Sequence, residues 1–558
     1  MKKLILLIIW LFFLINSAVT TAGLGIQPIP DAAPILHPPE SEPRSIHWNE
    51  NLDLYVQMGK SDIPVHEGIR RCILADSGTV VYYLDGYNRE GTVPLVTGIC
   101  EMEVPKKLIS IGVFTGGVSD YVGHYAHNID ANTYSLITAK DDNNTLSLQD
   151  DIFSLCDTFE ICTGVFNGDD GQVMVEIPAF YYKYQYQGGW HSYSISRDPL
   201  PGYNLHPAFH KNGVDVDVRY VGAYEGVLYN TSKGKYVNGL YLPFETPYRM
   251  SFDGTAEIIT SDDLTHPFTN LEAGVDTIVI SGTSRNNLTC GIINVTDATI
   301  TVDCDLQDEP NTLCTIQTQR DWSNDILSSV AGKAPITYGT RAQFRSIAAN
   351  RGKGWRQLDY DLMSAIQLLY LVEYGSFNSQ AKIGAGLTDW ESMWNNWNNC
   401  NPIEKTGLSN GSPTGNVTNG DGVKGSYVSY RWIENPWGHL SKWIDGINIY
   451  NCTPYVCNND AYFDDNTLTN YTFLGVTLPH LEGYQETLAP IARGFIPAST
   501  RGSADTYIAD YYFKGAGWWK AVLSSGSAHS GTMSGAFYLD ITPWSDYTHQ
   551  SITGRLCY

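Results

Sequence analysis

Two capped helical segments constrain the fold of this chain more than any other feature. Thr340 and Gln343 form a capping-box pattern, which predicts a helix that begins at Thr340 and runs to about Asn350. Asp359 is placed to begin a second helix, and Gly375 is placed to end it. Within it, apolar residues recur at helical spacing, at Leu362, Ile366, Leu369 and Tyr370. We therefore predict an α+β fold with two main helices packed on small, irregular antiparallel sheets.

The rest of the chain has the pattern of short strands and of loops rich in Gly, Tyr and Trp. β-branched and aromatic runs bounded by turn residues predict strands at 79–84, 173–177, 180–184 and 192–196. Two segments of different character, 95–167 and 252–320, are expected to be β-rich inserts. In the second, the segments 276–281, 291–295 and 298–303 predict strands of a small unit that can pack as a sandwich. Cys290, Cys304 and Cys314 are expected to cross-link this unit through disulfides.

The first 22 residues have the pattern of a signal peptide. Lys2 and Lys3 precede an apolar run from Leu4 to Ile15, and Ala22 ends a small-residue cleavage motif. The alternative is a membrane anchor, but the run is shorter than the ~20 residues of a spanning helix, and we find no later segment that could span. We predict a secreted or extracellular-surface protein. Residues 23–47 are Pro-rich and predict an extended arm or linker.

The net charge of −24 comes from 59 acidic and 35 basic residues, and this balance argues against a nucleic-acid partner. Export permits disulfides among the eleven cysteines. The candidate pairs are Cys452 with Cys457, Cys156 with Cys162, and Cys72 with Cys100. Close CxxC pairs with histidine partners are missing from the sequence, so no metal site is predicted from the cysteines. Eight sequons are candidate glycosylation sites: Asn143, Asn230, Asn287, Asn294, Asn410, Asn416, Asn451 and Asn470.

Several phrases, in order, resemble a family of phage tail-fibre and minor structural proteins. They include HEGIRRCILADSGTVVYYLDG (66–86), NGDDGQVMVEIPAFYYKY (167–184) and PGYNLHPAFHKNG (201–213), then the stretch 340–380 and YRWIENPWGHLSKWIDGINI (430–449). The resemblance implies a C-type-lectin-like core of the formylglycine-generating-enzyme-like form, as in the variable proteins of diversity-generating retroelements such as the major tropism determinant. This sequence differs from the phage proteins in its leader, its sequons and its many cysteines.

On that basis the chain divides into seven segments. A signal peptide (1–22) and an arm (23–47) precede a core region (48–94 and 168–251), which the insert 95–167 interrupts. A β-rich insert (252–320) then precedes a C-type-lectin-like domain (321–558) that ends in a ligand-binding tract.

The resemblance implies that exposed, variable positions lie near the C-terminus. The tract from Ser524 to Gln550 is dense first in small residues and then in aromatic residues, a composition typical of binding loops. We expect these residues to bind a surface glycan or protein: Tyr511, Tyr512, His529, Tyr538, Trp544, Asp546, Tyr547 and His549. The alternative for each is an ordinary core or loop position. For the whole chain, the alternatives are a subunit of an extracellular filament or virion appendage, self-associating through the arm, and a carbohydrate-active enzyme.

The enzyme branch of the resembled fold uses a cysteine pair in its late loops. Residues 526–540 contain no cysteine, so we predict a protein that is not an enzyme and needs no cofactor. In that branch a phrase similar to 435–438 lies near a bound calcium, and Asp445 is the carboxylate considered for one here. Arg555 is expected to be a structural arginine that holds the last strand.

Overall fold

The computed structural model describes residues 45–49, 54–57, 69–83, 108–111, 125–128, 133–141, 152–160, 166–169, 171–187, 190–242, 249–262, 267–268, 270–389, 404–418, 426–506 and 508–558. The expected signal peptide and nearly all of the arm lie outside these residues. So do Cys100, Cys162 and Asn143, and the predictions that rest on them stay predictions.

The predicted α+β class is wrong, because strands dominate the described residues and helices are confined to a short part of the chain. The helices are α3 (Arg341–Ala349), α4 (Tyr360–Tyr374) and α5 (Ser379–Lys382), with short 3-10 turns η3 (Pro207–Phe209), η5 (Asp460–Tyr462) and η6 (Gly531–Met533). The predicted helix ends are confirmed. Thr340 and Gln343 form the capping box, the Asp359 carboxylate accepts the Leu362 N–H at 2.9 Å, and Gly375 is left-handed at φ 59°.

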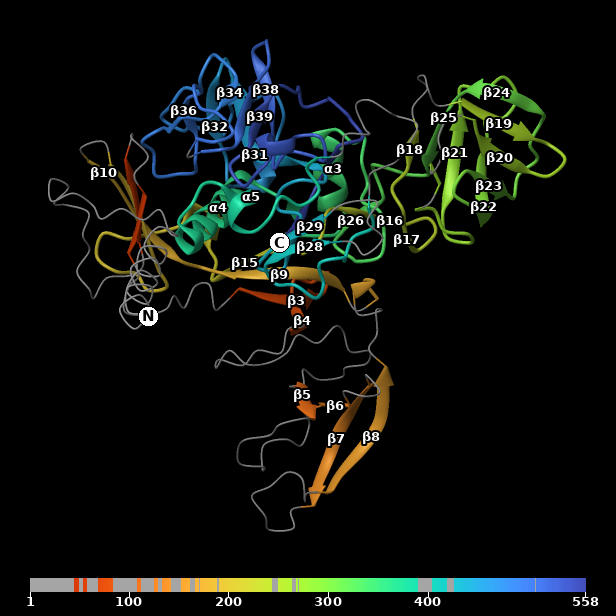
Figure 1. Ribbon diagram of the computed structural model, residues 1–558, viewed down its shortest axis with the longest axis horizontal. Coiled ribbons are helices and arrows are strands. Elements are labelled where there is room, and N and C mark those ends of the chain that lie inside the picture. Colours follow the sequence, from red (N-terminus) through yellow and green to blue (C-terminus); the bar gives the residue numbers. More distant parts are fainter. Residues whose placement is uncertain are drawn as a thin grey trace, which may run out of the picture.

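A six-stranded sheet joins segments far apart in the sequence. In spatial order it contains β27 (Arg356–Gln357), β41 (Leu556–Cys557), β15 (Val218–Gly222), β9 (Gln172–Pro178), β3 (Arg70–Leu74) and β4 (Val80–Tyr83). Strand β41 is therefore paired to β15, more than 300 residues earlier in the chain. Figure 1 shows α4 between β9 and β15 of this sheet and the blue C-terminal strands.

The C-terminal sheet carries the tract on which the functional prediction rests. Its order is β33 (Thr472–Phe473), β32 (Thr453–Val456), β31 (Ser441–Tyr450), β38 (Trp519–Ser524), β39 (Leu539–Ile541), β37 (Tyr511–Lys514) and β34 (Gly483–Tyr484), and β40 (Ile552–Thr553) pairs with β31. Helix α4 packs against this sheet, and its apolar side chains join those of β9, β15 and β31 in the main core. A second core surrounds Phe344 and Ile347 of α3.

The remaining sheets are smaller. A five-stranded sheet has the order β12 (Asn204–Leu205), β10 (Tyr181–Gln187), β11 (Trp190–Ser196), β1 (Ser45–Asn49) and β2 (Leu54–Gln57). One three-stranded sheet has the order β17 (Lys235–Val237), β16 (Val227–Asn230) and β26 (Ile326–Ser328). Another has the order β28 (Gly415–Thr418), β29 (Ser426–Tyr430) and β30 (Ile433–Glu434). A four-stranded sheet has the order β5 (Leu108–Ile111), β6 (Tyr125–Asn128), β7 (Thr133–Asp141), β8 (Ile152–Glu160), and two pairs are β13 (His210–Lys211) with β14 (Val214–Asp215) and β35 (Thr487–Leu488) with β36 (Pro497–Ser499).

Residues 240–318 form a β unit that stands to one side in Figure 1. Its sheet has the order β18 (Tyr241–Leu242), β25 (Thr315–Thr318), β21 (Thr277–Ser281), β22 (Thr289–Val295), β23 (Thr299–Val302), β20 (Ile258–Ser261), β19 (Arg249–Asp253) and β24 (Glu309–Leu313). Strands from both ends of this order contribute to one buried cluster, so the sheet folds over its own core. The three strands predicted here from sequence are present as β21, β22 and β23.

A disulfide between Cys290 and Cys304 joins β22 to the residues after β23, while Cys314 is a buried free thiol. Closing a loop of this length is worth about 3 kcal/mol, because the cross-link restricts the unfolded chain. We expect reductant to lower the melting temperature of the 240–318 unit in the full protein. A C290A/C304A variant should melt at the reduced value with or without reductant, and an identical melt of oxidised wild type and variant would contradict this.

The predicted pairing of Cys452 with Cys457 is wrong, since both are free thiols in the structure. The extended strand β32 separates them, and five residues at about 3.3 Å each span roughly 16 Å. A disulfide needs Cα atoms within about 7 Å. The short sequence spacing suggested a loop, but the residues between the cysteines form β32, the second strand of a hairpin with β31.

The described sequons differ in exposure. Asn287, Asn294, Asn416, Asn451 and Asn470 are exposed. Asn230 is buried, and its side chain binds its neighbours Ser232 and Lys233. Asn410 is half-buried, and its side-chain oxygen accepts hydrogen bonds from Arg71 and Tyr224.

Candidate ligand-binding hollow

A surface hollow of about 810 Å³ lies over the C-terminal sheet. Its floor is formed by strands, with Ser441 of β31, Leu523 of β38, Asp540 of β39 and Ile552 of β40. Its walls come from the loop 527–533 and the loop 543–549. We call this feature the C-terminal hollow. Its volume suits a small ligand or one or two sugar rings of a larger one.

Exposed aromatic side chains form one wall of the C-terminal hollow. Trp544 is 60% exposed and Tyr547 is 47% exposed, which is unusual for rings of this size. The Tyr547 and His549 rings are stacked, with centroids 6.2 Å apart and planes within 7° of parallel. The Lys520 Nζ lies 5.1 Å from the centre of the Trp544 ring. Flat apolar faces are thus presented beside polar groups.

The loop that carries these aromatics is fixed to the scaffold by its backbone. The Pro543 carbonyl accepts the Ala521 N–H of β38 at 3.0 Å, and the Ser545 carbonyl accepts the Arg341 N–H of α3 at 3.1 Å. Ser545 itself is buried, which places its neighbours Trp544 and Asp546 outward. A loop held in this way presents its side chains with little ordering cost on binding.

The floor and the other wall add ionisable and polar groups. The Asp540 Oδ1 accepts hydrogen bonds from the Thr542 N–H at 2.7 Å and the Thr542 hydroxyl at 2.6 Å, and Tyr538 also bonds to Asp540. Burial raises the pKa of Asp540 to about 6. Burial, assisted by His549, lowers the pKa of His529 to about 4, so this imidazole is neutral at pH 7.

The raised pKa of Asp540 makes stability depend on pH. Its value in the unfolded chain is 3.8, so the unfolded chain releases this proton first as pH rises. Between about pH 4 and pH 6 the free energy of unfolding should therefore fall, and the loss should persist above pH 6. We expect Asp540→Asn to reduce the difference in urea midpoint between pH 4.5 and pH 7. An equal difference in wild type and variant would show that Asp540 is not the source.

The structure brings six of the eight predicted ligand-binding residues to the C-terminal hollow. They are His529, Tyr538, Trp544, Asp546, Tyr547 and His549. Tyr511 and Tyr512 are not among the residues that line it. Tyr512 is 0% exposed and donates its hydroxyl to the Pro479 carbonyl at 3.0 Å, so its prediction as a binding residue is corrected to a core position. Tyr511 is half-buried and packs on Tyr484 and Phe513.

Sequence reasoning missed several residues of the C-terminal hollow, among them Ser441, Phe513 and Lys520. Ser441 is 72 residues before Phe513, the next residue of the site, and reaches it because β31 pairs with β38. Lys520 extends from β38 and donates to the Thr542 carbonyl at 2.6 Å. No local pattern marks these residues as part of a binding site.

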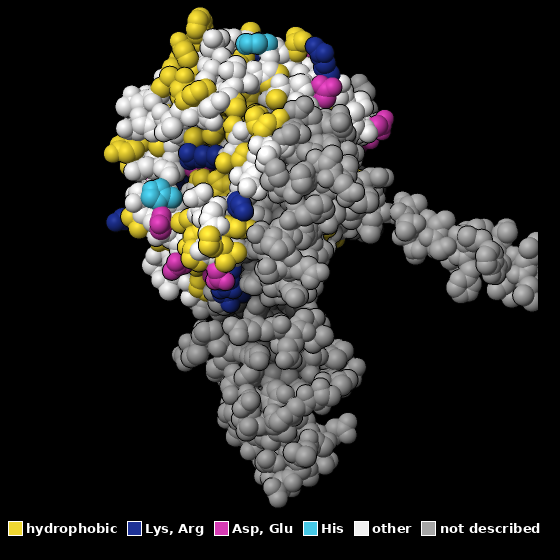
Figure 2. Space-filling view, turned by 90° about the vertical axis from the view of Figure 1, so that its left-hand side faces the viewer, with side chains coloured by type: hydrophobic (Ala, Val, Ile, Leu, Met, Phe, Trp, Pro, Cys, Tyr) yellow, Lys and Arg dark blue, Asp and Glu magenta, His cyan; other side chains and the backbone are white. Residues whose placement is uncertain are grey.

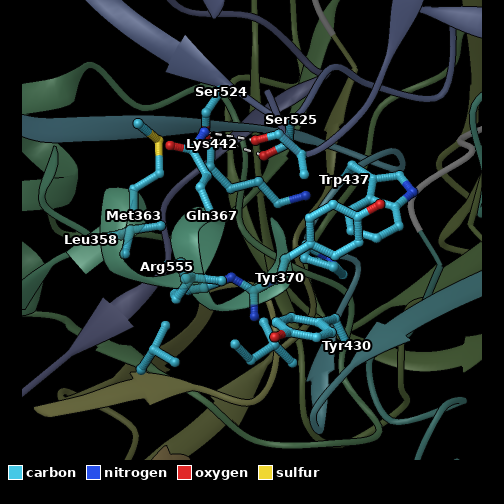
Figure 3. A pocket seen from close by; sticks show the side chains of 15 residues that line it. Leu358, Met363, Gln367, Tyr370, Tyr430, Trp437, Lys442, Ser524, Ser525 and Arg555 are labelled. Atoms are coloured by element: carbon cyan, nitrogen blue, oxygen red, sulfur yellow. Dashed lines mark hydrogen bonds between the residues drawn. The ribbon is translucent and has the colours of Figure 1, made fainter. Parts of the chain in front are cut away.

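Two of the further cavities among the described residues bear on the choice of site. A groove of about 650 Å³ lies beside the hairpin β16–β17, and its cations already have partners, with Arg351 Nη1 2.6 Å from Asp76 and Lys333 Nζ 2.5 Å from Glu272. The other is a buried cavity of about 50 Å³ beside α4. Figure 3 shows Lys442 and Arg555 between Met363 and Leu358 on one side and Tyr370, Tyr430 and Trp437 on the other. A space this small holds a water-sized molecule, not a ligand.

The considered calcium position is occupied by a protein cation. Both oxygens of the buried Asp445 carboxylate accept hydrogen bonds from Arg345, at 2.6 and 2.9 Å. The described part of the chain contains no cluster of three or more His, Cys, Asp and Glu side chains placed to hold a metal. None of its helices is long and apolar enough to cross a bilayer.

Arg555 holds the end of the chain, as predicted. Its guanidinium is buried and donates to the carbonyls of Gly222, Ala223, Glu434 and Asn435. These bonds link the last strand to β15 and to the segment after β30.

Comparison with known proteins does not identify the chain. No protein-family model and no curated protein matches this sequence.

Proposed function

We propose that this protein is a secreted or surface-displayed recognition protein that binds a glycan or protein ligand non-covalently in the C-terminal hollow. The observation that carries the proposal is the wall formed by Trp544, Tyr547 and His549 on a backbone-anchored loop. Rigid aromatics supply a large contact area at low entropic cost, and a concave site adds polar groups that select the ligand. The resemblance to tail-fibre proteins supports the same class of function.

A glycan is the first ligand class to test. Sugar rings combine an apolar face with hydroxyl groups, and the hollow combines the Trp544 face with the polar side chains of Asp540, Asp546 and His549. On the coloured part of the face shown in Figure 2, Asp and Glu side chains are few and lie among apolar and other side chains. The Cys290–Cys304 disulfide supports an oxidising location.

The test is binding of the secreted protein to a glycan and cell-surface panel. A W544A/Y547A/H549A variant should lose the binding that wild type shows, while its melting temperature stays close to that of wild type. The matched control is Y462A/F473A, which removes two exposed aromatics outside the hollow and should bind like wild type. Equal binding by wild type and the triple variant would contradict the proposal. Binding by none of them would favour the filament-subunit alternative.

A further inference from the structure

A buried group of polar side chains that do not line the C-terminal hollow joins Glu225, which follows β15, to the turn between β30 and β31 and to the start of β31. The carboxylate of Glu225 is its centre. Lys442 Nζ lies 2.8 Å from Glu225 Oε1, and Asn435 Nδ2 lies 3.5 Å from Glu225 Oε2. His439 Nδ1 donates to the same Oε2. All four side chains are no more than 1% exposed.

This arrangement places an amine and a carboxamide on the two oxygens of one carboxylate. The backbone holds both in place. The Asn435 N–H donates to the Val428 carbonyl at 2.7 Å, and the Asn435 carbonyl accepts from Arg555 at 3.2 Å. Lys442 lies at the start of β31, where its backbone pairs with Ser524 and Thr553. The two side chains therefore meet Glu225 without needing a rearrangement of the chain.

The surroundings are buried and provide room for a small product. The buried cavity of about 50 Å³ is lined by Pro436, which follows Asn435, and by Lys442 itself. The Trp437 and Tyr370 rings close it on one side, as Figure 3 shows. Burial of this kind limits access of bulk water to the Asn435 carboxamide, and hydrolysis of that carboxamide would compete with attack by the Lys442 amine. Its volume is that of about one or two water-sized molecules.

We propose that Lys442 and Asn435 join through an intramolecular isopeptide bond, with Glu225 moving the proton. The neutral Lys442 amine attacks Asn435 Cγ and forms a C–N bond. The attached nitrogen then gives a proton to Glu225, which passes it to the amide nitrogen of Asn435. The Asn435 Cγ–Nδ2 bond breaks and ammonia leaves, so one amine and one carboxamide become one secondary amide and one ammonia. No oxidant or other reactant is needed.

The protonation of Lys442 supports this chemistry. Burial lowers the pKa of Lys442 to about 8, against the opposing attraction of Glu225. A fraction of the Lys442 side chains is therefore neutral, and so nucleophilic, at neutral pH.

Pro436, the residue after Asn435, also simplifies the test. Because Pro436 has no N–H, Asn435 cannot lose ammonia by the usual cyclisation onto the next backbone nitrogen.

Mass spectrometry of the full-length protein tests the proposal directly. After reduction, the chain should be lighter by one ammonia than the sequence that remains after removal of the signal peptide. In a tryptic digest of the unfolded, reduced protein, cleavage after Lys442 should be blocked. The peptide 432–442 should then be absent, and the peptide 432–493 should appear, lighter by one ammonia and linked between Asn435 and Lys442. Release of the peptide 515–520 from the same sample shows that digestion at lysine is complete.

Two variants separate the linkage from the role of Glu225. Glu225→Gln keeps both reacting side chains and should release the peptide 432–442 at its unmodified mass. Lys442→Arg should have the mass that its own sequence predicts, with no loss of ammonia. Quantitative release of an unmodified 432–442 peptide from wild type would overturn the proposal, and this measurement does not depend on how either variant folds. Linkage in Glu225→Gln at the wild-type level would overturn the assigned role of Glu225.

Discussion

Replacing Arg555 by Ala is expected to prevent stable folding. The buried guanidinium donates to four backbone carbonyls, at 2.8, 3.2, 2.5 and 3.2 Å. An unpaired buried acceptor costs about 1–3 kcal/mol, so losing four donors at once removes several kcal/mol. The total stability of a domain is only about 5–15 kcal/mol. Arg555→Lys should recover little, because one ammonium cannot reach carbonyls on both sides as a planar guanidinium does.

The measurement is soluble yield followed by a thermal melt of any folded fraction. Arg501→Ala is the matched control, because Arg501 is exposed and its loss should leave yield and melting temperature unchanged. A well-folded Arg555→Ala protein with the wild-type melting temperature would show that the last strand is held by other contacts.

Replacing Trp544 by Ala is expected to weaken ligand binding at least tenfold while leaving the fold intact. Exposed tryptophans at the wall of a concave site supply much of the contact area in a recognition surface, and losing one typically costs 2 kcal/mol or more. The fold should tolerate the change because the side chain is 60% exposed and its loop is held by backbone bonds. Titration of the panel ligand against wild type and variant measures the change in dissociation constant.

Trp518 provides a close control for Trp544. It is 63% exposed, packs beside Tyr450 with ring centres 5.6 Å apart, and is not among the residues that line the C-terminal hollow. Trp518→Ala should therefore change the affinity by less than threefold, a small fraction of the effect at a central contact. A larger loss from Trp518→Ala than from Trp544→Ala would move the ligand site outside the hollow.

The helices were predictable because their signals are local. Thr340, Asp359 and Gly375 each act on backbone groups within four residues, so the sequence contains the whole interaction. The longer strands were predictable for a similar reason, since β21 (TIVIS) is a β-branched run and β9 (QVMVEIP) contains two valines and an isoleucine at alternating positions. Strands of two or three residues, such as β40 and β41, carry no such pattern and exist only because a distant strand pairs with them. The α+β expectation failed because the sequence does not reveal these short strands, and with them strands far outweigh helices in the described residues.

The site was predictable in part. Trp544, Tyr547 and His549 are rings in a loop rich in small and polar residues, and the structure places them together. Tyr511 and Tyr512 were both expected at the site because they precede the C-terminal tract, but successive residues of a strand point to opposite faces, and Tyr512 faces the core. Ser441 and Lys520 enter through strand pairing, which the local sequence does not specify.

Side-chain footprinting of the secreted protein with and without its panel ligand tests the central claim most directly. Oxidative labelling reports the exposure of each aromatic side chain, and the four rings to compare are Trp544, Tyr547, Trp518 and Tyr462. If the C-terminal hollow binds the ligand, labelling of Trp544 and Tyr547 falls on binding while labelling of Trp518 and Tyr462 does not change. Unchanged labelling of Trp544 and Tyr547 with protection at Trp518 or Tyr462 would contradict recognition through the hollow.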